Sequence, residues 1–515
     1  MILVANCRFE APSTYFLRQH RQIARLIFGM IFGRICALQI IRMEESERQS
    51  GGKRSNRASD LTAGPLGARI FRFAFFLAAT GILQQLFSAA DVAIVGRFCG
   101  KAAMAAVGSN VPVVGFLLSL FVGSAIGANV VVANAIGRKD ASAVRKAVRT
   151  AVYAPLWFGI LAAFSLQALV EPILHTLTVP QEVYPMARAY LVIFLWGLPA
   201  QMVYNFAAAL FRGDGDAKTP LYCLSAAGVV NVALNILFVA HFGMNADGVA
   251  LATTIANYLA AISLLACLSR RRGIVRFRVL DMRIDWRSLA GILRIGLPSG
   301  LQGAIFTGSN LVVQNGINSL GTDIMAGSAA AFNIEILSYF VINAFGHATT
   351  TFVGQNFGAK KLSRCRHSMR IAFSQALICA TVVAITLLSF STPLLRLFNE
   401  DAAVIAAGRI RLFFIISPIW INAAIELYTG ALRGYGISHI PAAITVVGVC
   451  VVRVIWMFII FPMRPTFDMI LWCYPVSWII TSSILCAMYI RHVRKISLEK
   501  RELETRNKEL RFYAK

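Results

Sequence analysis

Long apolar runs recur along most of the chain, and breaks rich in charged residues or in Gly and Pro separate them. An α-helix that crosses the hydrocarbon core of a bilayer needs about 20 mostly apolar residues. Twelve stretches meet this requirement, and they start near residues 70, 105, 146, 186, 220, 246, 290, 324, 368, 404, 441 and 467. The pattern predicts an all-α polytopic membrane protein with twelve transmembrane helices.

The composition agrees with a place in a lipid bilayer. Of the 515 residues, 57% are hydrophobic and 14% are charged, and the mean hydropathy is +0.66. One globular surface could not hide so much apolar side chain. The ten cysteines form no CxxC pair and no metal-ligand spacing, so we expect no cofactor.

The formal net charge of +26 would suggest a nucleic-acid partner in a soluble protein. Here the basic residues recur at alternate breaks, before the first span and after the second, fourth, sixth and eighth. Positively charged loops stay in the cytoplasm. We therefore expect both termini there, in a multi-pass protein of the plasma membrane that binds no nucleic acid.

Residues 1–64 are expected to form an N-terminal cytoplasmic extension. Their one apolar run, residues 26–33, is too short to span a bilayer, and no cleavage site of a signal peptide follows it. The polar stretch from Met43 is typical of a cytosolic start. Our hypothesis is that translation begins at Met43 and leaves residues 1–42 untranslated; an amphipathic surface helix is the alternative.

One stretch, residues 211–220, resembles a phosphate-binding loop: Phe-Arg-Gly-Asp-Gly-Asp-Ala-Lys-Thr-Pro. Such a loop needs Gly directly before its Lys, and here Ala217 precedes Lys218. Asp214 and Asp216 would also repel phosphate groups. We expect a tight turn after the fourth span instead, on the cytoplasmic side.

This stretch has a second copy, Leu-Arg-Gly-Tyr-Gly-Ile-Ser-His-Ile-Pro at 432–441, at an offset of 221 residues. Gly100 and Gly321 keep the same offset, as do Gly137 and Gly358. Residues 65–270 and 288–490 are therefore expected to be two copies of a six-helix unit. A basic cytoplasmic linker, 271–287, joins them, and a charged cytoplasmic tail, 491–515, follows. Units with an even number of spans are parallel repeats, which predicts two pseudo-symmetric bundles around a central cavity.

Several motifs together resemble those of a known family, the multidrug and toxic compound extrusion (MATE) secondary transporters, from Asp60 to about Arg491. These are Asp60-Leu-Thr-Ala-Gly-Pro, Ala90-Asp91-Val-Ala-Ile-Val-Gly, Arg-Gly-Asp-Gly-Asp-Ala-Lys-Thr-Pro, Asn231-Val-Ala-Leu-Asn235, Thr350-Thr-Phe-Val-Gly-Gln-Asn-Phe-Gly-Ala-Lys and Arg453-Val-Ile-Trp. The resemblance implies a multidrug efflux antiporter, not an enzyme, that admits sodium ions or protons and exports small organic, often cationic, compounds. We expect a monomer.

A carboxylate inside the first span is the strongest candidate for ion coupling. Asp91 precedes Arg97 by six residues, which places it about 9 Å inside the end of the helix. Intramembrane acids usually serve ion or proton pathways, although an acid can also reach towards the interface. Asn231 and Asn235 share a helix face, and Thr253 lies on the next span. Together they form a plausible oxygen shell for sodium.

The resemblance implies that these four positions form the cation-coupling site. In many relatives the position of Asn235 holds an acid. One carboxylate in place of two favours a weaker sodium site or a site that works by protonation of Asp91, because burial favours the neutral acid. The alternative for both asparagines is hydrogen bonding between helices.

In the second unit, Glu426 follows Asn205 of the first by 221 residues, and both are expected to face the cavity. Some branches of the family carry an acid one turn earlier, where this chain has Asn422. Glu426 either substitutes for that acid or pairs with Arg453, and we favour the pairing because an unpaired ion is costlier.

Two further candidates lie on the eighth span. Glu335 and His347 are twelve residues apart, about 18 Å along a helix, and so cannot form a pair. His347 could bind a cation or carry protons, or could be a packing residue.

The first helix has no proline hinge, because Phe76 stands where many relatives have proline, whereas the second unit keeps Pro298. Two other functions are alternatives to the antiporter. A flippase for lipid-linked oligosaccharides would need a basic cavity, and Arg453 is the only clearly intramembrane arginine that the sequence reveals. A membrane-embedded enzyme would act through His347 with Glu335 or Glu426, but no catalytic constellation is visible.

Overall fold

The computed structural model describes residues 60–513 except 178, 272, 279 and 280. The expectations for residues 1–59, including the start at Met43, lie outside this part of the chain. The described residues are helical with short connections and contain no strand. This confirms the prediction of an all-α protein.

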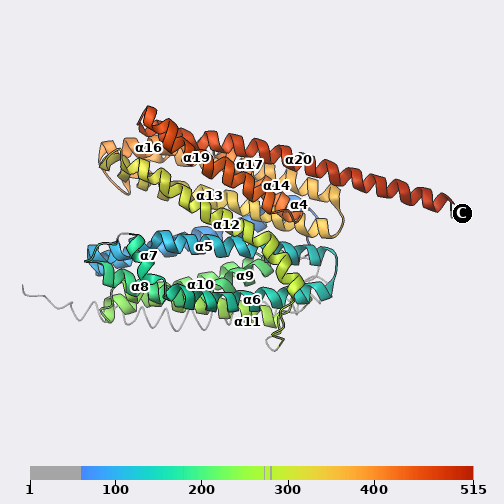
Figure 1. The fold of residues 1–515 in the computed structure, drawn as a ribbon, viewed down its shortest axis with the longest axis horizontal. Helices are drawn as coiled ribbons and strands as arrows, with labels where there is room; N and C mark the ends of the chain where they lie inside the picture. Colours follow the sequence, from blue (N-terminus) through green and yellow to red (C-terminus); the bar gives the residue numbers. More distant parts are fainter. Residues whose placement is uncertain (1–59, 178, 272, 279–280, 514–515) are drawn as a thin grey trace, which may run out of the picture.

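Most helices of the first unit form one layer and those of the second unit the other (Figure 1). The elements of the first unit are α4 (Leu66–Phe98), α5 (Gly100–Gly137), α6 (Ala141–Gln167), α7 (Val170–Thr176), α8 (Tyr184–Trp196), α9 (Leu198–Gly213), α10 (Lys218–Ile236), the π-helical turn η2 (Leu237–His241) and α11 (Ala246–Arg270). The first of these helices, α4, is labelled among the helices of the second unit in Figure 1 and also packs against α13 (Thr322–Gly358) of that unit.

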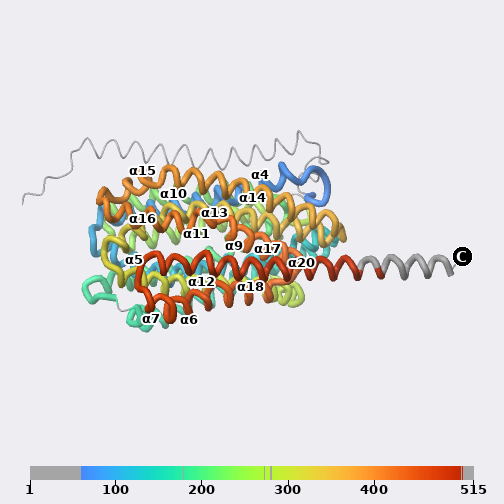
Figure 2. The backbone as a smooth tube through the Cα atoms, turned by 90° about the horizontal axis from the view of Figure 1, so that it is seen from above, coloured from blue at the N-terminus to red at the C-terminus, as the bar shows by residue number. Residues whose placement is uncertain are grey.

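The second unit begins after the basic linker. Its elements are α12 (Trp286–Asn318), α13 (Thr322–Gly358), α14 (Leu362–Ser389), α15 (Ser391–Arg396), α16 (Ala402–Ile416), α17 (Ile419–Gly434), α18 (His439–Thr445), the π-helical turn η3 (Val446–Val451), α19 (Val452–Ile455), the π-helical turn η4 (Trp456–Ile460), the short η5 (Phe461–Met463) and α20 (Phe467–Tyr513). In Figure 2, α20 extends past the other helices towards the C-terminus.

Ten helices of the described chain are long and apolar enough to cross a membrane. Two bent pairs complete the set: α8 with α9, at 46°, and α16 with α17, at 43°. Pro199 and Pro418 lie at these bends, where a missing backbone N–H weakens helix continuity. Large apolar side chains such as Trp157, 58% exposed, cover the outside, as expected for a surface in contact with lipid. The prediction of twelve spans is thus confirmed.

Backbone conformation repeats at the same offset as the sequence. Six of the nine described residues with positive φ form pairs 221 positions apart: Gly100 and Gly321, Lys139 and Lys360, Gly215 and Gly436. Such φ values strain most L-residues, so a matching pair indicates a matching turn. The two units therefore share these three turns.

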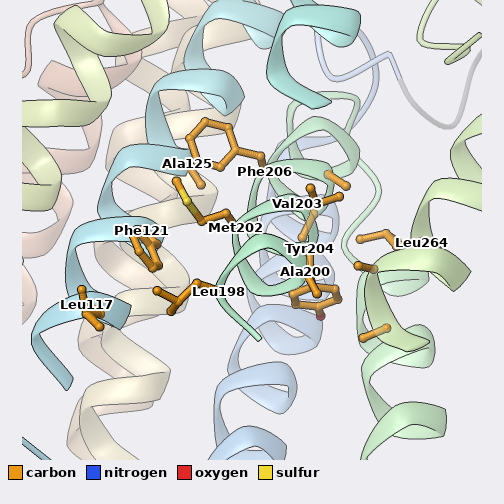
Figure 3. Packing of buried hydrophobic residues seen from close by; sticks show 14 of the residues in the cluster. Leu117, Phe121, Ala125, Leu198, Ala200, Met202, Val203, Tyr204, Phe206 and Leu264 are labelled. Atoms are coloured by element: carbon orange, nitrogen blue, oxygen red, sulfur yellow. The ribbon is translucent and has the colours of Figure 1, made fainter. Parts of the chain in front are cut away.

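Apolar packing holds each unit together. Figure 3 shows Phe121 and Ala125 on α5 directed towards Leu198 and Met202 on α9, and all four are buried. The opposite side of α9 packs against α11, where Leu264 is fully buried. The helix α4 is uninterrupted despite its length and contains no proline.

The two units meet most closely where α5 crosses α12. A Cβ atom on Gly296 would overlap the backbone carbonyl of Ser124, and one on Gly300 would lie 2.5 Å from that of Leu120. The absence of side chains lets the helix backbones touch, as small residues do between membrane helices. Further along α12, a Cβ on Gly308 would meet nothing within 4 Å.

We call the end of the molecule that carries Arg138, Lys139, Lys360 and Lys361 the basic end. The close contact of α5 and α12 lies in the half of the molecule nearest this end, since Ser124 and Gly296 belong to the halves of their helices next to Arg138 and the basic linker. The units are thus joined at the basic end and less closely packed at the other.

The segment before α4 also holds the basic end together. The backbone N–H of Leu61 donates to Oε1 of Gln355 at 3.1 Å, and Nε2 of Gln355 donates to the carbonyl of Gly213 at 2.8 Å. One amide side chain of the second unit therefore binds both the N-terminal segment and the end of α9. A related bond, from Asn134 to the carbonyl of Gly434 at 3.4 Å, runs the opposite way between the units.

A methyl group added at the contact of α5 and α12 is expected to destabilise this arrangement. Gly296→Ala should lower the free energy of unfolding by about 1–3 kcal/mol, because the contact cannot accept more volume. Gly308→Ala, on the same helix with open space around it, is the matched control and should be neutral or slightly stabilising. Thermal unfolding in detergent measures both, and equal midpoints would contradict the predicted steric conflict.

Candidate functional site

The carboxylate of Asp91 on α4 lies against α10 and α11. Its Oδ1 accepts a hydrogen bond from Nδ2 of Asn235 at 2.5 Å, and its Oδ2 accepts one from Oγ1 of Thr253 at 3.3 Å. Oγ1 of Thr253 also accepts from Nδ2 of Asn231 at 3.2 Å. Oδ1 of Asn231 in turn accepts from Asn235 at 3.4 Å. Three helices thus bring the four predicted residues together, and we call them the acidic cluster.

Only neutral groups surround the carboxylate in this acidic cluster. Amide and hydroxyl donors stabilise a carboxylate but leave its charge in place. The Oδ1 atom of Asn235 is buried and has no hydrogen-bond partner in the described structure. Hard monovalent cations and protons both bind to oxygen atoms of this kind. The acidic cluster can therefore hold one positive charge.

The π-helical turn η2 follows Asn235 directly. A π-helical turn interrupts the regular hydrogen bonding of an α-helix and is frequent at functional sites. This turn was not predictable from the residues Leu-Phe-Val-Ala-His, which include neither Gly nor Pro.

Glu335, a candidate from the sequence, is already paired in the structure. Nη2 of Arg411 on α16 donates to Oε1 of Glu335 at 2.7 Å, and Nε donates to Oε2 at 3.1 Å. Nη1 of Arg411 donates to Oγ of Ser328 at 2.7 Å. Glu335 and Arg411 are 1% and 3% exposed, so this is a buried, bidentate ion pair.

Arg411 corrects the sequence interpretation that Arg453 is the only clearly intramembrane arginine. Arg411 interrupts the apolar run of α16. The signal was present, since a buried Glu335 requires a basic partner on a neighbouring span. What the sequence could not show was which span would supply it.

The favoured pairing of Glu426 with Arg453 is wrong. Arg453 donates from Nη1 to Oδ1 of Asn310 at 3.1 Å and from Nε to Oγ of Ser477 at 3.4 Å. No carboxylate is ion-paired with it in the described chain. Glu426 instead lies beside α13, where a Cβ on Gly346 would be 3.1 Å from its carbonyl oxygen. The two side chains belong to different contacts of the second unit.

The remaining candidates do not join the acidic cluster. Asn205 donates to the carbonyl of Gln201 on its own helix at 2.9 Å, and Asn422 is buried on α17. His347 is half-buried on α13, and its backbone carbonyl accepts from Thr351. No hydrogen bond between any two of these candidate side chains is found in the described residues.

The stretch 211–220 forms a turn, as expected. Gly215 has φ of +86°, and Asp216 accepts from the backbone N–H groups of Lys218 and Thr219 at the start of α10. Arg271 of the linker pairs with Asp214 at 2.6 Å and with Asp216 at 3.1 Å. These aspartates therefore hold the linker against the turn.

Known proteins share the sequence pattern of both units. The model of the MatE family matches residues 77–237 and 298–459, once in each unit. The chain belongs to the MatE family. This confirms the resemblance, and with it the prediction of a transporter in place of an enzyme.

Individual relatives of this MatE chain agree. It is 27% identical over 377 residues to a probable multidrug resistance protein NorM of Thermotoga maritima, covering 72% of this chain and 81% of that protein. It is 24% identical over 387 residues to an FAD transporter of Shewanella oneidensis, covering 72% and 82%. A solved MATE family transporter in an outward-facing conformation has a TM-score of 0.79 at 19% identity and covers 85% and 98%. That structure supports the fold.

Loss of one partner of the buried ion pair should be costly. Arg411→Leu leaves the Glu335 carboxylate buried without compensation and should reduce the free energy of unfolding by about 3–5 kcal/mol. The double variant Glu335→Leu with Arg411→Leu should recover most of this loss, because no charge is left buried. Unfolding midpoints in detergent measure the coupling energy between the two side chains. If the double variant were destabilised by the sum of the two single losses, the ion pair would be contradicted.

Proposed function

We propose that this protein is a cation-coupled antiporter of the plasma membrane that exports small organic compounds in exchange for sodium ions or protons. The observation that supports the proposal most directly is the acidic cluster, in which a single carboxylate has only neutral partners. The basic end would lie in the cytoplasm with both termini. The coupling ion would be the only cofactor.

The cost of a bare charge inside the bilayer can couple the entry of a cation to the export of a substrate. An uncompensated carboxylate inside a span is expensive, so the acidic cluster is more stable when a sodium ion or proton neutralises Asp91. A conformational change that opens the acidic cluster first to the water on one side of the membrane and then to the water on the other side would carry that cation across. Export of a substrate can then be driven by the cation gradient.

The arrangement of the two units supports alternating access. Glycines bring α5 and α12 into backbone contact near the basic end, while the outer parts of these helices expose side chains such as Val111 and Leu311. A rocking motion of one unit against the other would exchange the open and closed ends. No hinge in α4 is needed, which agrees with its unbroken helix.

The names of two relatives support a proposal for the cargo. One is named a multidrug resistance protein and another an FAD transporter. We therefore propose small organic compounds as the cargo.

Neutralisation of the acid tests the proposal. In proteoliposomes, an inward sodium or proton gradient should drive efflux of a fluorescent organic cation by the wild type. Asp91→Asn should reduce this rate at least about ten-fold, because the amide cannot exchange a cation. Asp323→Asn changes an exposed acid at the start of α13 and should leave the rate unchanged. Normal efflux by Asp91→Asn would refute the role of Asp91, and no efflux under either gradient would refute the antiporter.

The identity of the coupling ion can be tested by adding a second acid. Asn235→Asp puts a second carboxylate next to that of Asp91, in place of the amide that now donates to it, and two negative charges attract sodium more strongly than one. The apparent sodium affinity, measured as sodium-dependent thermal stabilisation of the purified protein, should rise about ten-fold or more. Asn205→Asp, outside the cluster, is the control, and equal effects of both substitutions would contradict the site.

A further inference from the structure

The guanidinium of Arg453 is buried without a counter-ion. The side chain is 0% exposed, and the ring of Tyr474 lies 4.2 Å from its central carbon. Its hydrogen-bond partners, Asn310 and Ser477, are neutral, and its Nη2 atom is buried with no partner among the described residues. A cation held inside a span in this way is costly unless an anion compensates it.

The neighbouring ion pair does not supply that anion. Both oxygens of Glu335 are bonded to Arg411, and the ring of Tyr474 lies between the two arginines, 6.0 Å from Arg411. Two guanidinium groups and one carboxylate leave one positive charge in excess. The second unit is thus electrostatically incomplete around Arg453.

The position of Arg453 corresponds to that of the acidic cluster in the first unit. The acidic cluster joins α4, α10 and α11, and Arg453 joins the equivalent helices α12, α19 and α20. Tyr474 follows Thr253 by 221 residues, and Arg453 follows Asn231 by 222. The offset at Arg453 is thus one residue longer than elsewhere in the repeat. The π-helical turn η3, which lies before Arg453 and has no counterpart among the described residues of the first unit, accounts for this residue, because a π turn holds more residues than an α turn.

The charge at this equivalent position is inverted. Val312 occupies the place of Asp91, and in the register that pairs Arg453 with Asn231 the place of Asn235 is taken by Met457, next to Trp456. Nε1 of Trp456 donates to the carbonyl of Met469 at 2.7 Å and is thereby used in packing. Among the equivalent helices, the second unit therefore carries a base where the first carries an acid.

We infer that Arg453 is the centre of an anion-binding site in the second unit. The site would take a carboxylate or phosphate group of an exported organic compound, or a free inorganic anion such as chloride. Nη2 of Arg453 is the free donor, and Nδ2 of Asn310 is a second donor, since that amide uses its oxygen for Arg453. Asn310 and Phe306, whose ring lies 5.4 Å from the central carbon of Arg453, are half-buried on α12, so an anion would approach Arg453 past these two residues. This inference rests on the proposed function for its cargo but can be tested by binding alone.

Two dyes of matched shape test the site: a zwitterionic rhodamine with a free carboxylate, and the cationic methyl ester of the same dye. Fluorescence anisotropy with the purified full-length protein measures binding, and efflux from proteoliposomes measures transport. Arg453→Gln should weaken binding of the zwitterion about ten-fold or more and change that of the ester less than about two-fold. Arg453→Lys should restore part of the preference, because it keeps the charge. Asp323→Asn, at an exposed acid outside both sites, is the control and should leave the ratio of the two dye affinities unchanged.

The source of the anion is distinguished by salt replacement. If chloride is the ligand, the wild type should unfold at a higher temperature in chloride than in gluconate, and Arg453→Gln should lose this difference. If Arg453→Gln does not fold, Asn310→Ala should show the same selective loss to a smaller extent. Equal effects on both dyes together with no effect of chloride would overturn the anion site. Selective binding without gradient-driven efflux of either dye would leave the site standing and would refute the proposed antiport.

Discussion

The interior of a bilayer offers no water to stabilise a charge, so every ionised side chain within the spans must be compensated by the protein or by something that it binds. Three places in this structure respond to that constraint. Glu335 and Arg411 compensate each other through a bidentate pair. Asp91 has amide and hydroxyl partners only, and Arg453 has an amide, a hydroxyl and an aromatic ring. The paired charges contribute to the architecture, whereas we propose that Asp91 binds a cation and Arg453 an anion.

The contact between the units follows from a related constraint on the backbone. The last carbonyl groups of a helix have no partner within the helix. At the basic end, the carbonyl of Gly213 accepts from Gln355 of the second unit, and that of Gly434 accepts from Asn134 of the first. Each unit thus caps a helix of the other. Because these residues keep the offset of 221, the Arg-Gly-x-Gly stretches mark the repeat and also hold its two copies together.

Much of this could be predicted from the sequence, because it depends on local periodicity. The length of the apolar runs determined the spans, and the repeated glycines revealed the two units. Local spacing placed Asn231 and Asn235 on one helix face and Asp91 within a span, whereas the resemblance to the MATE family implied that these residues and Thr253 form one site. The pairing of Arg411 and the surroundings of Arg453 were not predictable, since they depend on how α16, α19 and α12 pack, which no local pattern encodes. The π-helical turns were also missed, and they alter which residues share a helix face.

The π-helical turns explain how two copies of one six-helix unit can carry opposite charges at equivalent helices, an acid in the first copy and a base in the second. A polar side chain precedes η2 in the first unit and η4 in the second, so both sites use the same departure from a regular helix. The added turn η3 then rotates α19 by about the angle of one residue, roughly 100°, which brings Arg453 to the face that Asn231 occupies. Substitution alone would have placed Val452 there. The chemistry of the second site therefore depends on an insertion in helix geometry as much as on the identity of its arginine.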